Sequence, residues 1–484
     1  MPRTNLSAVP TVPCTLAGAP PVPPDATLVD YYTKNGMLVR CVPYYGSRAA
    51  LYVCTCNGAC RQQCNGEQGI AHMFEHCGFL PKTSKNDVDV IATQYAGSPL
   101  VGANAQTSED YMLYSNDMVC NNNPAHVAAV AQGMRYLCDP QTTMSKLVRD
   151  NAVTPAATAE IVGAVGGEAA INSAWPELDM HAAPTGAPVR CDPSSQVRKC
   201  LMIANESAYG LVGASTAADV GNARVPTADS VMGFFNRLPE ARGMAHRMVI
   251  AVMDPAHVKA HVLPHFDDAM ATTPRPRDMM WRVDVPTMLR SASLHTQFSP
   301  SPGVNAGALT FLRPHPGSPA AWHLRTGAKC LITKTGVPGV CQDFKNRGLV
   351  LDASYIEPPV AEGAATLLVQ LHPRAGPDVL AAFRNQAVSA TYPAALVQQA
   401  QAELRAETRE ARTGAAPQVA MAAFVHAMRE NGEPFYGDWV HPCSGDEVQR
   451  AWRDFLPSAC VTFMSPQVAH GWDATNVTQL FAQA

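Results

Sequence analysis

Apolar residues near the start of the chain follow strand patterns that give way to a helical pattern. Two apolar runs within residues 30–43 flank Asn35-Gly36, a dipeptide that accommodates the positive φ angles of a tight hairpin turn. Residues 49–56 form another short β-rich run, which is followed by a loop containing Gly and Asn. Residues 69–80, GIAHMFEHCGFL, then carry apolar residues at helical spacing. We therefore expect a strand hairpin, a third strand and a helix, in that order.

The remaining pattern predicts two units that each mix helices and strands. Residues 125–140 and 228–238 indicate amphipathic helices, and residues 248–266 indicate a buried strand, a turn and a helix. A proline-containing stretch near residue 280 is typical of a linker. Strand and helix patterns then begin again from about residue 291.

The second unit ends as the first does. Residues 367–373 predict a strand, residues 377–429 a long helical region interrupted near residues 413–417, and residues 459–466 a closing strand. The segments VIAVMDP and CVTFMSP are similar, which suggests an internal repeat. We predict an α+β fold with these boundaries: a proline-rich leader over 1–27, a catalytic domain over 28–272, a linker over 273–290, and a related non-catalytic domain over 291–484.

Composition narrows the class of protein. Hydrophobic residues make up 47% of the 484 residues and charged residues 16%, as in a folded globular protein. A formal net charge of -4 gives no general attraction to nucleic acid, and no apolar stretch is long enough to predict a membrane span. The leader has no apolar h-region, so we do not expect secretion and expect the 15 cysteines to be reduced thiols.

Five of these cysteines cluster around the helix of residues 69–80. They could hold a second metal or form a redox switch, whereas Cys54 and Cys56, two residues apart, also fit small buried residues on one face of a strand. We favour the buried interpretation. The cluster consists of Cys54, Cys56, Cys60, Cys64 and Cys77.

The helix of residues 69–80 contains the motif HxxEH. Residues i, i+3 and i+4 share one face of a helix, so His72, Glu75 and His76 can point toward one small volume. Two imidazoles at this spacing suit zinc, and the carboxylate between them can take a proton from the water that the metal activates. The motif predicts one catalytic Zn²⁺ per chain, with His72 and His76 as ligands and Glu75 as general base.

HxxEH is the inverzincin signature, and residues 69–80 resemble the core motif of the pitrilysin, or insulinase, family. Residues 35–43 are similar to the family's opening hairpin, and residues 96–115 resemble its downstream strand pair, with Asn104, Ala105 and Thr107 in the expected phrase. The resemblance implies a zinc metalloendopeptidase that hydrolyses peptide bonds of enclosed peptides or unfolded protein segments. Asn104 and Ala105 would then contact the substrate.

The resemblance also implies the architecture and the third zinc ligand. Two related α/β sandwich domains form half of the family's clamshell, so a second two-domain subunit, in a homodimer or heterodimer, is expected. The family takes its third ligand from a later helix. The best match nominates Glu168, with Glu160 as the competitor.

One departure favours a different role. Relatives generally use an Arg and a Tyr, seven residues apart, in the second domain, and the matching positions here are Phe344 and Leu351. Losing an oxyanion donor costs roughly 100-fold or more in rate. Lys345, Arg347 or Tyr355 could substitute. The alternative is a weakened or inactive family member that serves as a structural or assembly subunit.

The cellular setting is inferred from the resemblance and from the leader. A cytoplasmic or virus-associated location, akin to that of the poxvirus-type virion metalloendopeptidase, fits the free cysteines and the absence of a convincing transit peptide. The mitochondrial matrix is the alternative.

Overall fold

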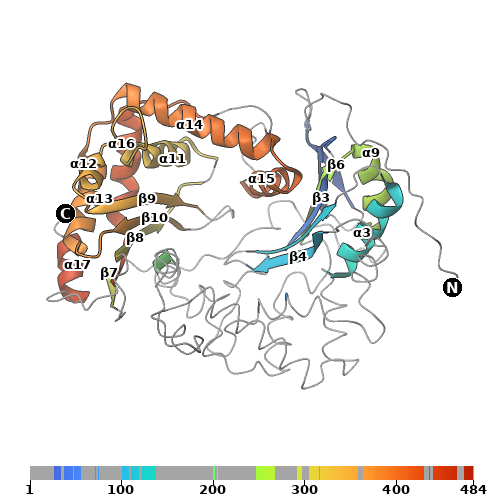
Figure 1. The fold of residues 1–484 in the computed structure, drawn as a ribbon, viewed down its shortest axis with the longest axis horizontal. Helices are drawn as coiled ribbons and strands as arrows, with labels where there is room; N and C mark the ends of the chain where they lie inside the picture. Colours follow the sequence, from blue (N-terminus) through green and yellow to red (C-terminus); the bar gives the residue numbers. More distant parts are fainter. Residues whose placement is uncertain are drawn as a thin grey trace, which may run out of the picture.

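Two β-sheets, one in each half of the chain, organise the molecule (Figure 1). The fold comes from a computed structural model of the 484-residue chain. The structure describes residues 27–33, 37–46, 48–55, 71, 75, 101–107, 111–118, 123–137, 200–201, 204, 247–267, 292–296, 305–315, 317–357, 364–429, 435, 440–465 and 474–482.

The first sheet, sheet A, contains six strands in the order β1-β2-β6-β3-β5-β4. The predicted hairpin is confirmed as β1 and β2, which pair antiparallel with Val29 opposite Cys41, while its turn dipeptide lies outside the described residues. The predicted strand of residues 49–56 and the strand pair after the motif are also present. The strands are β1 (Val29–Tyr32), β2 (Leu38–Pro43), β3 (Ala49–Thr55), β4 (Val101–Thr107), β5 (Met112–Met118) and β6 (Arg247–Met253).

The second sheet, sheet B, repeats the connectivity of sheet A. Its order is β7-β11-β8-β10-β9, which matches β2-β6-β3-β5-β4 strand for strand. The parallel pair is at the same place in both sheets, since β2 runs parallel to β6 and β7 runs parallel to β11. The similar segments VIAVMDP and CVTFMSP therefore form equivalent strands, β6 and β11. The strands of sheet B are β7 (Ala292–Thr296), β8 (Asn305–Leu312), β9 (Val350–Ile356), β10 (Ala364–Leu371) and β11 (Cys460–Ser465).

Helices from the first half cover one face of sheet A. The helix α3 (Pro124–Leu137) and the rod formed by α9 (Pro255–His257), η6 (Val258–Val262) and α10 (Leu263–Phe266) pack there side by side. Their apolar residues, such as Val130, Val258 and Phe266, share one core with Leu51 and Val249 of the sheet. Burying such side chains contributes roughly 1.5–3 kcal/mol each. The helices predicted within 125–140 and 248–266 are confirmed, and residues 228–238 lie outside the described residues.

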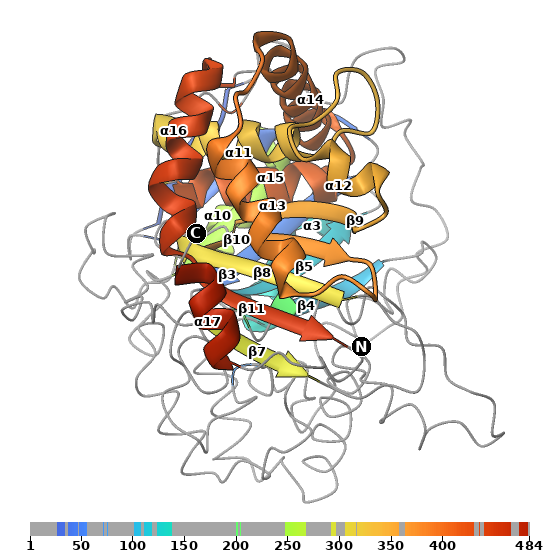
Figure 2. The same ribbon diagram turned by 90° about the vertical axis from the view of Figure 1, so that its left-hand side faces the viewer.

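Helices of the second half cover one face of sheet B (Figure 2). Trp452, Phe311 and Phe383 are fully buried in the core between these helices and the sheet. The helices are α11 (Pro319–Leu331), α12 (Gln342–Asn346), α13 (Pro377–Ser389), α14 (Ala394–Thr413), α16 (Gly445–Phe455), η8 (Leu456–Ser458) and α17 (Ala474–Ala482).

The opposite face of each sheet is covered by the other half of the chain. Helix α15 (Ala416–Arg429) belongs to the second half, yet it lies beside sheet A (Figure 1). Its residues Val419, Ala423 and Phe424 share one core with Ile250 of that sheet. Arg40 of β2 connects sheet A to this helix, because its guanidinium lies 3.2 Å from His426 Nδ1 of α15. The same guanidinium donates two hydrogen bonds to Asp30 of β1, which hold it in place. In return, Cys200, Leu201 and Ala204 pack against Ala306 and Ala308 of sheet B. Each half of the chain thus supplies part of the hydrophobic core on the sheet of the other half.

The interruption predicted near residues 413–417 is confirmed, since α14 ends at Thr413 and α15 begins at Ala416. The part predicted to be continuous over 377–413 is two helices, because α13 ends at Ser389 and α14 begins at Ala394, after Pro393. The break after Thr413 separates α14, which packs on sheet B, from α15, which packs on sheet A. The α+β fold class is confirmed. The predicted linker lies outside the described residues, so the domain boundaries remain a prediction. Among the helices that the structure describes, none is both long and apolar enough to cross a membrane.

Candidate functional site

Glu75, the acidic residue of the HxxEH motif, is held in a buried position. Glu75 and Ala71 are both helical and lie four residues apart, so they share one helix face. Ala71 is fully buried, and Glu75 is only 5% exposed. A carboxylate is rarely buried to this degree without partners, because transfer of a charge from water is costly. The contacts of Glu75 therefore define its role.

Thr107, the last residue of β4, supplies one of those contacts. Its hydroxyl donates a hydrogen bond to Glu75 Oε2 at 2.5 Å. This is a short, direct hydrogen bond. Thr107 pairs with Met112, whose side chain belongs to the core beneath α3, so Glu75 approaches sheet A from its α3 side. The contact fixes one carboxylate oxygen at the end of an edge strand.

The strand β4 lies at the edge of sheet A and pairs, within the described residues, only with β5. Asn104 is exposed on this strand and Ala105 is half-buried. The side chain of Asn104 accepts a hydrogen bond from its neighbour's amide, at 2.9 Å from Ala105 N. An edge strand presents backbone groups with which an extended peptide can pair. The residues that the sequence nominates for substrate contact thus lie on a strand suited to that purpose.

The predicted metal ligands lie outside the described residues: His72, His76, Glu168 and its competitor Glu160. Within the parts of the chain that the structure describes, no three His, Cys, Asp or Glu side chains converge as a metal site. Glu75 and Thr107 are the part of the predicted site that the structure describes, and the hydrogen bond between them holds one oxygen of the carboxylate that the sequence nominates as general base.

The positions matched to the family's Arg and Tyr contain apolar side chains with structural surroundings. Phe344 packs into the core of the second half, edge-on to Phe383 at 5.6 Å between ring centroids. Leu351 lies on the edge strand β9 and is 38% exposed. Neither side chain can donate a hydrogen bond.

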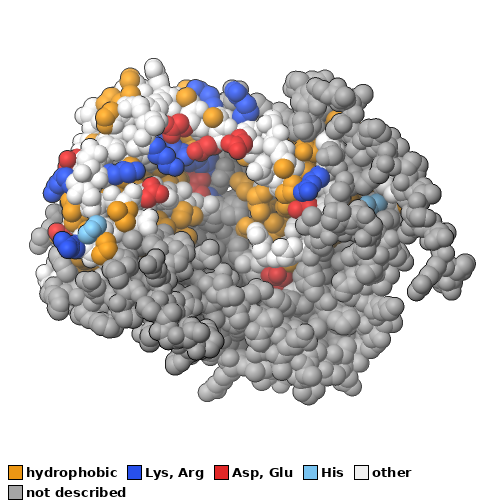
Figure 3. All heavy atoms as spheres, viewed as in Figure 1, with side chains coloured by type: hydrophobic (Ala, Val, Ile, Leu, Met, Phe, Trp, Pro, Cys, Tyr) orange, Lys and Arg blue, Asp and Glu red, His pale blue; other side chains and the backbone are white. Residues whose placement is uncertain are grey.

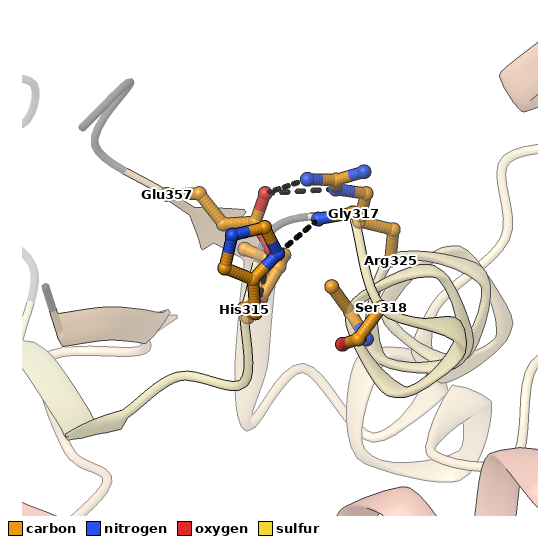
Figure 4. A network of polar contacts seen from close by, with 7 residues as sticks. His315, Gly317, Ser318, Arg325 and Glu357 are labelled. Atoms are coloured by element: carbon orange, nitrogen blue, oxygen red, sulfur yellow. Dashed lines mark hydrogen bonds and ion pairs between the residues drawn. The ribbon is translucent and has the colours of Figure 1, made fainter. Parts of the chain in front are cut away.

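Of the three proposed substitutes, Tyr355 is committed to an internal network. Its hydroxyl donates to Glu357 Oε1 at 2.8 Å, and burial raises its pKa well above the ordinary value. Arg325 binds Glu357 Oε2 through two nitrogens, each at 2.7 Å (Figure 4). The Arg325 guanidinium also stacks on the ring of Trp322. This network holds the end of β9 against α11 near the loop of His315 (Figure 4). Tyr355 is therefore a structural residue.

The other two proposed substitutes lie near α12. Arg347 is exposed and forms a 3.4 Å ion pair with Asp343 one helical turn away. Lys345 is half-buried on the same short helix. Both carry charge, and neither is held in a network like that of Tyr355 among the described residues.

The cysteines that the structure describes are free thiols. Cys54 is fully buried in β3, as favoured from the sequence, and the other members of its cluster lie outside the described residues. Burial raises the pKa of Cys41 to about 12, and Cys330 and Cys341 are raised to the same degree. Such thiols are unreactive at neutral pH.

A separate hollow lies between α14 and α15, with a volume of about 610 Å³. Hydrophobic side chains gather near the centre of this face, where α15 lies, with acidic and basic side chains beside them (Figure 3). Two lining residues of the hollow have further contacts: Glu407 forms an ion pair with Lys329, and the Arg412 guanidinium stacks on the ring of Phe435. The lining residues are Glu407, Thr408, Glu410, Ala411, Arg412, Gln418, Met421, Ala422, Val425 and His426.

Comparison with known proteins bears on the fold. No family model and no curated protein matches the sequence. Among solved structures, a protease from Helicobacter pylori superposes with a TM-score of 0.64 at 15% identity, over 91% of this chain and 100% of that one. The peptidase M16 inactive domain from Pseudomonas fluorescens superposes with a TM-score of 0.61 at 14% identity, over 91% of this chain and 99% of that domain. The chain has the M16 peptidase fold. Pitrilysin gives a TM-score of 0.59 at 13% identity, over 95% of this chain and 48% of pitrilysin, so this chain superposes on about half of that longer chain.

These likenesses confirm the predicted pitrilysin-like fold. The neighbours with the M16 fold include both a protease and an inactive domain, so the fold alone is compatible with either role. The sequence did not reveal that Thr107 contacts Glu75. The available signal was a hydroxyl residue at the end of the strand that follows the motif helix.

Proposed function

We propose that the protein is a zinc-dependent metalloendopeptidase with Glu75 as its general base. The observation that carries the proposal is the buried Glu75 carboxylate, held by Thr107 at the end of an edge strand in a molecule with the M16 fold. His72, His76 and Glu168 would hold the metal, with Glu160 as the alternative third ligand. When bound there, zinc supplies a Lewis acid that polarises the substrate carbonyl and activates water.

The protein's own residues orient the substrate and move a proton. An extended peptide pairs with the outer edge of β4 at Asn104 and Ala105, which brings its backbone near the end of the strand. Thr107 holds Oε2 of Glu75 on one side. Glu75 then accepts the proton of the attacking water and returns it to the leaving amine, as general acid–base catalysis requires.

Glu75→Gln tests the proposal. General-base catalysis contributes typically 10²–10⁴-fold, so this variant should lose at least about 100-fold of the cleavage rate of an unfolded protein substrate while retaining zinc. Metal content per chain and the rate of fragment appearance are measured together. Glu410→Gln, an exposed glutamate of α14, is the matched control and should leave both unchanged.

The alternative is an assembly subunit without useful peptidase activity. Phe344 and Leu351, where relatives have an Arg and a Tyr, favour it, as does the likeness to an inactive M16 domain. It predicts that zinc is retained but no cleavage occurs, even when candidate partner subunits are added. Cleavage that disappears in Glu75→Gln would exclude it.

A second two-domain subunit is part of the proposal, because the chain superposes on only about half of pitrilysin. The chain mass is 51.6 kDa, so a homodimer would have about twice that mass in light scattering. A monomer that becomes active only with a different subunit indicates a heterodimer.

A further inference from the structure

The helical rod that follows β6 carries three histidines at intervals of four residues. His257, His261 and His265 each precede an apolar residue of the core, namely Val258, Val262 and Phe266. The apolar row is fully buried, and the three histidines are half-buried beside it. The histidines therefore form a row along the margin of the packed face.

A π-helical turn aligns this row. An α-helix turns about 100° per residue, so eight residues overshoot two full turns by about 80° and would carry the third histidine off the row. Residues Val258–Val262 form a wider π turn, which takes up part of that excess. The rings of His257 and His261 lie 5.9 Å apart, edge to face. Such π turns are rare and occur frequently at functional sites.

One ring nitrogen of His257, Nδ1, is buried without a hydrogen-bond partner among the described residues. A buried polar atom in this state is destabilising, and an ion or a water that satisfies it is a common explanation. The nearby Asp254 side chain is already used, because it accepts from Ala256 N at 2.8 Å as the helix cap.

We propose that His257 and His261 form a second divalent-metal site, which binds a late first-row ion such as Zn²⁺ through two imidazoles, with water as the remaining ligand. Histidines four residues apart on a helix can share one such ion, at about 2.0–2.1 Å from each nitrogen, and imidazole suits zinc, copper and nickel. Within the described residues the site has two protein ligands, because no third His, Cys, Asp or Glu there completes the group. His265, one turn further, is not a ligand.

The zinc stoichiometry of the full chain tests this proposal. Metal-free protein is dialysed against Zn²⁺, and the wild type should bind two equivalents per chain. His257→Ala and His261→Ala should each lose one equivalent, or bind it at least tenfold more weakly, while His265→Ala and Lys259→Ala retain both. Unchanged binding in His257→Ala and His261→Ala, or a loss in His265→Ala alone, overturns the site.

A double variant separates this site from the proposed catalytic one. His72→Ala/His76→Ala should lose the other equivalent and keep the one that depends on His261. In that background zinc should raise the thermal unfolding midpoint, and adding His261→Ala should abolish the rise. A single wild-type equivalent that vanishes in His72→Ala/His76→Ala refutes the second site and leaves the proposed function intact. A single wild-type equivalent that vanishes in His261→Ala supports the second site and contradicts zinc binding at the proposed catalytic site.

Discussion

The contact between Thr107 and Glu75 places a strand residue next to the proposed catalytic base. Because the hydroxyl donates to Oε2 at 2.5 Å, it orients the carboxyl group. The role of the hydroxyl can be tested by substitution, since Thr and Ser carry the same hydroxyl and Val has the shape of Thr without it.

Thr107→Val should therefore lower the cleavage rate by roughly 10- to 100-fold, as misplaced catalytic groups do, and destabilise the fold by about 1–3 kcal/mol. Thr107→Ser keeps the hydroxyl, so it should retain most of the cleavage rate and most of the stability of the wild type. Cleavage rates and urea unfolding are measured on the same preparations. If Val and Ser behave alike, the hydroxyl has no part in positioning Glu75.

The network of Arg325, Glu357 and Tyr355 makes a prediction that does not depend on activity. The side chains of Arg325 and Glu357 are 10% and 6% exposed, and removing one partner of a buried pair costs about 3–5 kcal/mol. Arg325→Met should lower the free energy of unfolding by that amount in urea denaturation. Arg347→Met, which breaks the exposed pair with Asp343, should cost less than about 1 kcal/mol.

At the scale of elements, the close approach of α11 and α16 depends on a glycine. A Cβ at Gly327 would lie 2.2 Å from Trp452 Nε1, and Trp452 is fully buried, so the indole has little room to move. Gly327→Ala should lower the thermal midpoint, because overpacking costs about 1–3 kcal/mol and outweighs the gain of up to about 1 kcal/mol in helix propensity. Adding Trp452→Phe should recover part of the loss. Strictly additive effects would show that the two residues do not clash.

The start of α16 makes that helix sensitive to acid. Ser444 and Glu447 form a capping box in which the Ser444 backbone N–H donates to Glu447 at 2.8 Å. This bond, and then the Ser444 hydroxyl, lower the pKa of Glu447. A carboxylate with a lowered folded pKa adds stability above its unfolded pKa of about 4.3 and loses it as the pH falls through the folded value.

Glu447→Gln should consequently be less stable than the wild type at pH 7, and the difference should shrink toward pH 3. Urea unfolding at the two pH values measures it. A difference that grows on acidification would contradict the assigned direction of the pKa shift.

Most elements could be predicted from the sequence, because their signals are local. The break between α14 and α15 follows from Gly414 and Pro417, and the start of α9 follows from Asp254 and Pro255. The π turn could not be predicted, because the sequence pattern of residues 258–262 does not distinguish it from an α-helical turn. Nor could the contact of Thr107 with Glu75, which joins residues 32 positions apart.

At the scale of the whole molecule, the exchange of covering segments joins the two halves. Phe424 of α15 is fully buried against sheet A and lies edge-on to Tyr111 at 4.9 Å. Phe424→Ala should destabilise the protein by about 3–5 kcal/mol and expose sheet A to protease before sheet B. Limited proteolysis followed by mass spectrometry locates the first cuts. Met421→Ala, at a half-buried residue on the margin of the same core, should destabilise the protein less and is the comparison.

The reach of α15 also governs how the protein is made. The ribosome completes β6 at Met253, but the residues that cover its outer face begin at Ala416, 416 − 253 = 163 residues later. At a translation rate of about 5–20 residues per second, the apolar face of sheet A stays exposed for roughly 8–33 s before α15 is synthesised. Slower elongation after residue 253 should therefore increase the aggregated fraction of the newly synthesised protein.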